Sequence, residues 1–119
     1  MRIGFIGAGK MAEAIIAALL ESKQVAAHEV FASDIDAERR QLLKTRYGIN
    51  MYSKNALIPG DAETLILVVK PQQLDVVLAE LAALITSRHL VISIAAGKKI
   101  AGIESRLTEA RVIRVMPNL

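Results

Sequence analysis

The chain has 119 residues, of which 53% are hydrophobic and 23% charged, as in an ordinary soluble domain. It contains no cysteine, which excludes disulfides and thiolate metal sites. The net charge is only +3 and 3% of the residues are aromatic, so we expect no nucleic-acid partner. No apolar run approaches the roughly 18 residues of a membrane span, and the first residues lack the apolar core of a secretory signal. We therefore expect no membrane partner and a cytoplasmic location.

Short apolar runs rich in β-branched residues alternate along the chain with stretches of helical period, without repeats or linkers. Strands are predicted at Arg2–Ile6, Val30–Ser33, Ile49–Tyr52, Thr64–Val69, Leu90–Ile94 and Val112–Met116. Helices are predicted at Met11–Glu21, Ala37–Tyr47, briefly after Ser53, at Gln72–Leu84 and around Ile100–Leu107. This alternation predicts one α/β domain over residues 1–119, with a doubly wound, Rossmann-like fold and a mainly parallel sheet of about six strands.

The fourth strand and the helix after it can be placed more closely. The fourth strand is apolar throughout from Leu65 to Val69, which is typical of a parallel strand covered on both faces and places it in the middle of the sheet. Pro71 fits the first turn of a helix and keeps Lys70 out of the α region. A strand therefore ends near Lys70 and a helix begins. The apolar stripes of the helices, including Leu84, are expected in the core.

A glycine-rich turn, Gly7-Ala8-Gly9-Lys10-Met11-Ala12, follows the first strand and opens the first helix. Gly7 would allow the tight turn, Gly9 would let a pyrophosphate approach the backbone, and Ala12 would let the helix pack close to the strand. The anion would meet unpaired amides at the positive end of the helix dipole. Glycine turns also occur for structural reasons alone, but this position after a strand favours a dinucleotide site.

The end of the second strand is where such folds hold the adenosine ribose. Asp34 would accept hydrogen bonds from the ribose hydroxyls and repel a 2′-phosphate, which favours NAD(H). Ser33 could instead donate to a phosphate, and Arg39 and Arg40 are within reach of the same place. A purely structural alternative is that Asp34 or Asp36 caps the next helix and the arginines are solvated.

Three more motifs follow strands at their carboxyl ends, where ligands of open parallel sheets bind. They are Val68-Val69-Lys70-Pro71, Ser93-Ile94-Ala95-Ala96-Gly97 and Val115-Met116-Pro117-Asn118. In this order, and together with the glycine turn, they resemble the N-terminal dinucleotide-binding domain of pyrroline-5-carboxylate reductase. The resemblance runs along the whole chain, and the combination is more specific than the glycine turn alone.

The resemblance implies reduction of the small imine 1-pyrroline-5-carboxylate to L-proline, with NADP(H) expected from the family and NAD(H) allowed by Asp34. No catalytic residue is assigned. The vicinity of the nicotinamide and substrate would hold Lys70, Ala95, Ala96, Gly97 and Asn118. Of these, Ala95, Ala96 and Gly97 are small enough to let a flat ring approach the backbone, and Gly97 can adopt a positive φ. The cofactor-binding residues expected from motif and resemblance are Ile6, Gly7, Ala8, Gly9, Lys10, Met11, Ala12, Ser33, Asp34, Arg39, Asn55, Val68, Val69, Lys70 and Pro71.

Other polar residues receive simpler interpretations. Lys70 would face the cofactor or orient a carboxylate, since an imine that is already cationic needs little more than hydride and orientation; its alternative is a solvated lysine. His28 and His89 are interpreted as surface residues of loops. No set of residues has the spacing of metal ligands, so no metal is expected.

The resemblance implies a C-terminal helical dimerisation domain, which we expect to be absent from these 119 residues. A full-length form is expected to be a homo-oligomer, and the isolated 119 residues are expected to bind nucleotide but to turn over poorly, because half a cleft orients substrate badly. Three alternatives stay open: a non-catalytic dinucleotide-binding or regulatory module, the cofactor domain of a β-hydroxyacid dehydrogenase or deazaflavin-dependent NADP reductase, and an interaction scaffold whose glycine turn is accidental.

Overall fold

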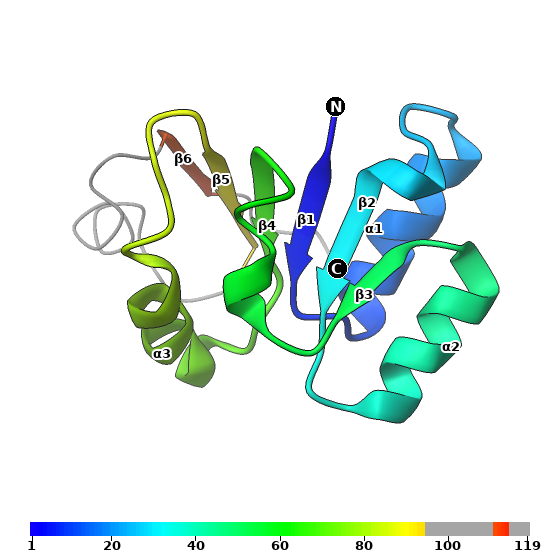
Figure 1. Cartoon of the computed structure of the whole chain (residues 1–119), viewed down its shortest axis with the longest axis horizontal. Helices are drawn as coiled ribbons and strands as arrows, with labels where there is room; N and C mark the ends of the chain where they lie inside the picture. The colour runs from blue at the N-terminus through cyan, green and yellow to red at the C-terminus, as the bar shows by residue number, and fades with distance from the viewer. Residues whose placement is uncertain (95–110, 115–119) are drawn as a thin grey trace.

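Six parallel strands form one sheet in the order β3-β2-β1-β4-β5-β6 (Figure 1). This computed structural model describes residues 1–94 and 111–114. The strands are β1 (Ile3–Ile6), β2 (Val30–Ser33), β3 (Asn50–Tyr52), β4 (Thr64–Leu67), β5 (Leu90–Ser93) and β6 (Arg111–Arg114). The helices are α1 (Lys10–Glu21), α2 (Ala37–Tyr47) and α3 (Pro71–Leu81), with short 3-10 turns η1 (Ala27–Glu29) and η2 (Asn55–Leu57).

The strand order confirms the predicted doubly wound fold, because it is the order of a Rossmann sheet. β4 lies between β1 and β5, so the strand that is apolar throughout is central, as predicted. The order reverses between β1 and β4, and ligands of such sheets bind at the carboxyl ends of the strands beside that reversal.

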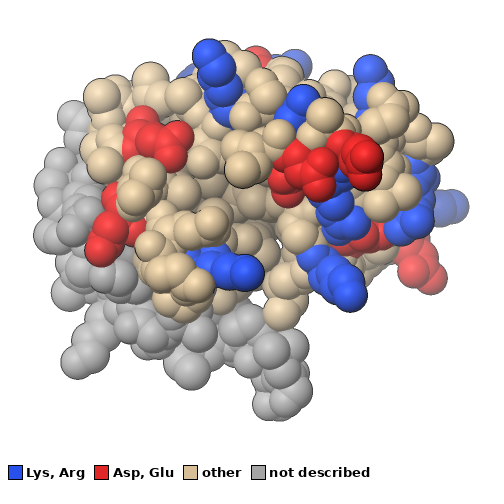
Figure 2. All heavy atoms as spheres, turned by 90° about the horizontal axis from the view of Figure 1, so that it is seen from below, with Lys and Arg blue, Asp and Glu red and all other residues tan. Residues whose placement is uncertain are grey.

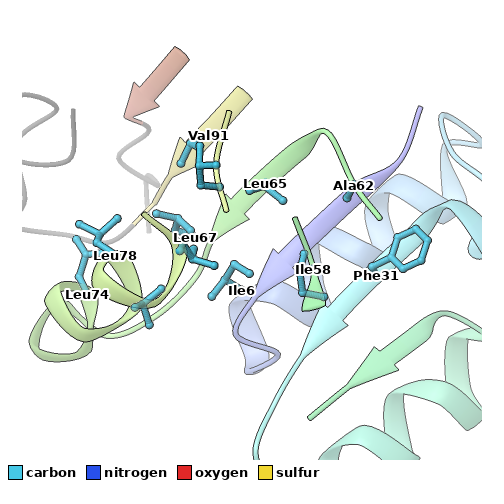
Figure 3. Close-up of a cluster of buried hydrophobic side chains, with 12 residues drawn as sticks. Ile6, Phe31, Ile58, Ala62, Leu65, Leu67, Leu74, Leu78 and Val91 are labelled. Atoms are coloured by element: carbon cyan, nitrogen blue, oxygen red, sulfur yellow. The ribbon is translucent and has the colours of Figure 1, made fainter. Parts of the chain in front are cut away.

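The two faces of the sheet are covered by different helices. Ile3 and Phe5 of β1 belong to a buried cluster with Ala12 and Ile16 of α1. Ile6, one residue further, belongs to the opposite cluster, which contains the buried side chains of α3 (Figure 3). Successive strand residues point to opposite faces, so these short apolar strands fill two cores at once.

Most predicted boundaries agree within one or two residues, and α3 is the main exception. The helix ends at Leu81, where the amides of Leu84 and Ile85 both donate to the Leu81 carbonyl and form a turn. Ile85 therefore enters the core and Leu84, predicted as core, is 40% exposed. The 3-10 turn η1 was not predicted. The expected helix around 100–107 and the end of the last strand lie outside the described residues.

The prediction that His89 is a surface residue is wrong, whereas His28 is exposed as expected. His89 is 2% exposed. Its Nδ1 accepts from the Thr86 amide at 2.9 Å, which leaves Nε2 to donate to the Pro59 carbonyl at 2.8 Å. The ring thus joins the loop before β5 to the loop before β4, and this pairing of distant loops has no signature in a local pattern.

A helix that crosses a bilayer has to be both long and apolar. None of the helices within residues 1–94 and 111–114 combines the two properties.

Candidate functional site

A cleft of about 510 Å³ opens at the carboxyl ends of β1, β2 and β4. Figure 2 views this edge of the sheet and shows a hollow near its middle, with lysine or arginine atoms on both sides. The lining residues come from the glycine turn, from the end of β2 and the loop after it, from η2, from the loop after β4, and from α3. They are Gly7, Ala8, Gly9, Ser33, Asp34, Ile35, Asn55, Val68, Lys70, Gln72, Gln73, Val76, Val77 and Glu80.

The cleft brings together eight of the residues expected at a cofactor site: Gly7, Ala8, Gly9, Ser33, Asp34, Asn55, Val68 and Lys70. Ile6 and Ala12 are buried in the two cores behind it. Lys10, Met11, Arg39, Val69 and Pro71 are neighbours in sequence or space but do not line it. The expected residues Ala95, Ala96, Gly97 and Asn118 lie outside the described residues.

Sequence reasoning missed Ile35 and the contribution of α3. Gln72 and Gln73 begin this helix directly after the carboxyl end of β4, and Val76, Val77 and Glu80 follow along the same side. The topological rule that points to the ends of the strands could have indicated Gln72 and Gln73. It could not have indicated Val76 or Glu80, which lie further along the helix.

The two glycines of the turn are required for different reasons. Gly7 has φ +101°, and a Cβ placed there would lie 2.6 Å from the Val68 carbonyl oxygen, so the fold itself requires glycine. Gly9 has φ −78°, and a Cβ there would meet nothing within 4 Å. Nothing in the described part of the fold needs glycine at position 9, and the missing side chain leaves room in the cleft.

The beginning of α1 supplies donors on the same side. The first intrahelical bond runs from the Glu13 amide to the Gly9 carbonyl at 2.9 Å, so the amides of Lys10, Met11 and Ala12 have no helical acceptor. The positive end of the helix dipole lies there as well. Free amides at the start of a helix are suited to an anionic group.

The two aspartates after β2 have separate roles. Asp36 is the N-cap of α2 and accepts from the Glu38 amide at 3.0 Å, so the capping alternative holds for this residue. Asp34 accepts from the Asp36 amide at 2.9 Å and lines the cleft. The carboxylate of Asp34, with two oxygens and one such bond, keeps acceptor capacity for a ligand.

Ser33 joins β2 to the η2 turn. Its side chain is buried, and Oγ lies 2.7 Å from Asn55 Oδ1 and 3.4 Å from the Phe5 carbonyl oxygen. A hydroxyl has a single proton, and the shorter contact indicates that it is donated to Asn55. In this arrangement Ser33 orients Asn55 towards the cleft.

Both arginines at the start of α2 donate to backbone carbonyls around the cleft. Arg40 Nη1 bonds the carbonyls of Asp34 and Ile35 at 2.8 and 3.0 Å. Arg39 Nε bonds the Ala8 carbonyl in the glycine turn at 2.6 Å. Neither guanidinium is simply solvated, and both restrain loops that line the cleft.

Glu13 of α1 is the acceptor that holds this side of the site together. Its carboxylate lies 2.7 Å from Arg39 Nη2, 2.6 Å from Arg46 Nη1 and 2.6 Å from Tyr47 Oη. The hydrogen bonds from Tyr47, Arg46 and Arg39 lower the pKa of Glu13 from 4.5 to about 2. Glu13 is therefore ionised throughout the physiological range.

A lowered pKa in the folded state makes stability depend on acidity. Glu13 contributes its stabilisation above pH 4.5, and the contribution is lost as the pH falls towards the folded pKa of about 2. Glu13→Gln is expected to lower the free energy of unfolding by about 1–2 kcal/mol at pH 7. The effect of the substitution should shrink as the pH falls from 4.5 towards about 2. Urea denaturation at several pH values measures this, with Glu21→Gln at the far end of α1 as the control. A difference that is the same at every pH would contradict the assignment.

Lys70 begins the other side of the cleft. It is the N-cap of α3, and its φ of −65° and ψ of 146° lie outside the α region, as predicted. Pro71 lies in the first turn as predicted, and it begins the helix one residue before the predicted start at Gln72. The side chain of Lys70 is exposed and lines the cleft, and no other residue in the described ranges pairs with it. The described residues contain no group of three or more His, Asp or Glu side chains that could hold a metal ion.

Curated relatives match nearly the whole chain. It is 44% identical over 119 residues to the pyrroline-5-carboxylate reductase of Methanosarcina acetivorans and 40% identical over 118 residues to that of Synechocystis. Each match covers 99% of this chain and 44% of the relative, so the chain spans less than half the length of either. These relatives confirm the resemblance that the motifs indicated.

Solved structures give the same fold. The pyrroline-5-carboxylate reductase of Coxiella burnetii superposes with a TM-score of 0.92 at 30% identity, over 99% of this chain and 44% of that one. Prephenate dehydrogenase of Aquifex aeolicus superposes with a TM-score of 0.82 at 16% identity, over 96% of this chain and 41% of that one, which shows only a shared fold. A protein-family model matches residues 2–97, and the chain therefore belongs to the family described as NADP oxidoreductase, coenzyme F420-dependent.

Proposed function

We propose that the chain is the cofactor-binding part of a reductase that converts 1-pyrroline-5-carboxylate to L-proline with a nicotinamide dinucleotide. The observation that carries the proposal is the open cleft beside Gly9, where a side chain would meet nothing in the described fold. The names of the curated relatives supply the substrate. A cytoplasmic location and a homo-oligomeric full-length form belong to the same proposal.

The described residues fit a dinucleotide. The amides at the start of α1 suit its pyrophosphate, and Gly9 leaves the backbone accessible. Asp34, directly after β2, and Asn55, in η2, both line the cleft and suit the adenosine ribose. Lys70 presents a cation at the end of β4, where it would orient a carboxylate or a phosphate. The loop Ala95-Ala96-Gly97 and Asn118 would approach the nicotinamide and the substrate.

A reduced nicotinamide held by these residues would supply the hydride for the imine carbon, and the imine nitrogen, protonated beforehand, would become the secondary amine of proline. The residues of this chain then have to bind the cofactor, fix its orientation and exclude water. With the imine nitrogen protonated beforehand, hydride transfer requires no side chain among the described residues to accept or release a proton.

The cofactor is proposed to be NADP(H), with NAD(H) as an alternative. The matching family is described as an NADP oxidoreductase, and the pyrroline carboxylate reductase of Plasmodium falciparum was crystallised with NADP bound. Asp34 in the cleft favours the ribose diol of NAD(H), since a carboxylate repels a 2′-phosphate. Titration of the chain with both nucleotides decides between them.

A second candidate is hydride exchange between NADP and coenzyme F420, a deazaflavin. The description of the matching family supports it. Both candidates use the same cofactor cleft, so they differ only in the second substrate.

The test joins this chain to the remaining part of the Methanosarcina acetivorans relative and compares the chimera with the chain alone. We expect the chimera to form proline from 1-pyrroline-5-carboxylate as nucleotide is oxidised, and the chain alone to bind nucleotide but to form proline far more slowly. A chimera that binds nucleotide without oxidising it in the presence of the imine would overturn the proposal. Reduction of F420 by that same chimera would support the second candidate.

A further inference from the structure

Arg39 connects the second helix to the glycine turn. It lies in α2, and its Nε donates to the Ala8 carbonyl at 2.6 Å, 31 positions earlier in the chain. The Nη2 of the same guanidinium donates to Glu13 Oε1 at 2.7 Å. One side chain therefore bonds both the turn and the first turn of α1 that follows it.

Bonding the Ala8 carbonyl also fixes the next amide. No peptide bond in the described residues is cis, so the Ala8–Gly9 unit is planar and trans. In such a unit the carbonyl oxygen of Ala8 and the N–H of Gly9 point in opposite directions. Gly9 lines the cleft, and its N–H has no acceptor among the described residues. Arg39 thus determines the direction of an amide that is available to a ligand.

The guanidinium of Arg39 belongs to a larger cluster of hydrogen bonds centred on Glu13. The carboxylate of Glu13 accepts from Arg46 and Tyr47 as well as from Arg39, and all four residues lie on α1 or α2. The side chains of Arg39 and Glu13 are only 20% and 17% exposed. Charge-assisted bonds in this partly buried cluster are shorter and stronger than ordinary ones, so the turn is held from two helices.

We propose that Arg39 is a positioning residue that holds the glycine turn for the pyrophosphate of a bound dinucleotide, and is not the recognition group for a 2′-phosphate. The inference rests on the proposed function of the cleft and specifies how that cleft is organised. NADPH and NADH share the pyrophosphate and differ in the 2′-phosphate. Loss of a residue that positions the turn must therefore weaken the binding of both nucleotides by a similar factor.

The experiment measures the Kd of NADPH and of NADH for the parent chain, Arg39→Gln and Arg39→Lys. We expect Arg39→Gln to weaken both nucleotides by a similar factor, about 10- to 100-fold, because it loses a charge-assisted bond that fixes the turn. Arg39→Lys keeps the charge but not the forked donor geometry, so it should restore only part of the affinity. Glu13→Gln keeps Arg39 but removes its ionic support, and should weaken both nucleotides by a smaller factor.

Two control variants make the result interpretable. Arg88→Gln removes the same charge from an exposed loop before β5 and is expected to leave both Kd values unchanged. Asp34→Ser removes the carboxylate that opposes a 2′-phosphate and should change the ratio of the two Kd values, which establishes that the assay detects selectivity. Thermal denaturation of each variant confirms that it is folded at the titration temperature.

Each outcome decides the question. A loss confined to NADPH in Arg39→Gln would overturn the positioning role in favour of 2′-phosphate recognition, and unchanged Kd values would reduce Arg39 to a structural ion pair. A parent chain that binds neither nucleotide would contradict this inference and the proposed function together. The remaining outcome concerns the substrate alone. If the parent binds both nucleotides and Arg39→Gln weakens both equally, but the chimera forms no proline, the positioning role of Arg39 stands and only the proposed substrate is refuted.

Discussion

Gly9→Trp is expected to abolish measurable nucleotide binding while the chain stays folded. The indole would occupy the cleft beside the start of α1, where the fold leaves open space, and would block the approach of a pyrophosphate to the backbone. We expect Kd for NADPH and NADH to rise at least about 100-fold, which corresponds to about 2.7 kcal/mol. Because Gly9 is the N-cap of α1 and has no side-chain contacts to lose, stability should fall by no more than about 1 kcal/mol.

Gly60→Trp is the matched control. Gly60 lies in an exposed turn before β4, and a Cβ there also meets nothing within 4 Å. This variant adds the same side chain to the surface outside the cleft, so its affinity for both nucleotides should equal that of the parent. Calorimetric titration measures the affinities and urea denaturation measures the stability. Undiminished binding by Gly9→Trp would show that the nucleotide binds somewhere else.

The fold was predictable because local patterns and topology agree. Runs such as Leu65–Val69 and the helical period of α1 identify the elements, and the short connections leave few alternatives to a right-handed parallel sheet. What failed were the features that depend on contacts between distant loops. His89 is buried because its ring fits between Pro59 and Thr86, and neither neighbour is adjacent to it in sequence.

The candidate site was predicted as a set of loops rather than as a network of contacts. The motifs placed Gly7, Gly9, Asp34 and Lys70 around one cleft because each follows a strand of the same sheet. Charge and position suggested that Arg39 could approach a phosphate, whereas in the structure its guanidinium donates to the Ala8 carbonyl. The rotamer of a long side chain depends on partners from other elements, and a sequence pattern does not contain that information.

Gly9 and Gly7 also separate two requirements that the motif alone combines. At position 9 the fold tolerates a side chain and the proposed ligand does not, so a substitution there should affect binding. At position 7 the backbone conformation and the packing against Val68, directly after β4, both exclude a side chain, so a substitution there should affect stability first. The same motif therefore contains one residue that the fold requires, Gly7, and one that we propose the ligand requires, Gly9.

Gly7→Ala is accordingly expected to destabilise the chain by about 2–5 kcal/mol. The left-handed φ of +101° is costly for any residue with a Cβ, and that Cβ would lie 2.6 Å from the backbone oxygen of Val68. Such a loss is a large part of the total stability of an ordinary domain, which is about 5–15 kcal/mol. Urea denaturation gives the free energy of unfolding directly.

Gly48→Ala separates the two causes. Gly48, the C-cap of α2, also has a positive φ, +73°, but a Cβ there has room, with Ala27 Cβ 3.9 Å away. Its loss should therefore stay near 1 kcal/mol, the cost of the left-handed conformation alone. If both variants lose the same free energy, the contact with Val68 contributes nothing. If Gly7→Ala loses more free energy of unfolding than Gly48→Ala, the difference measures the cost of the contact with Val68. That contact is where the glycine turn, which lines the cleft, packs against the residue directly after β4.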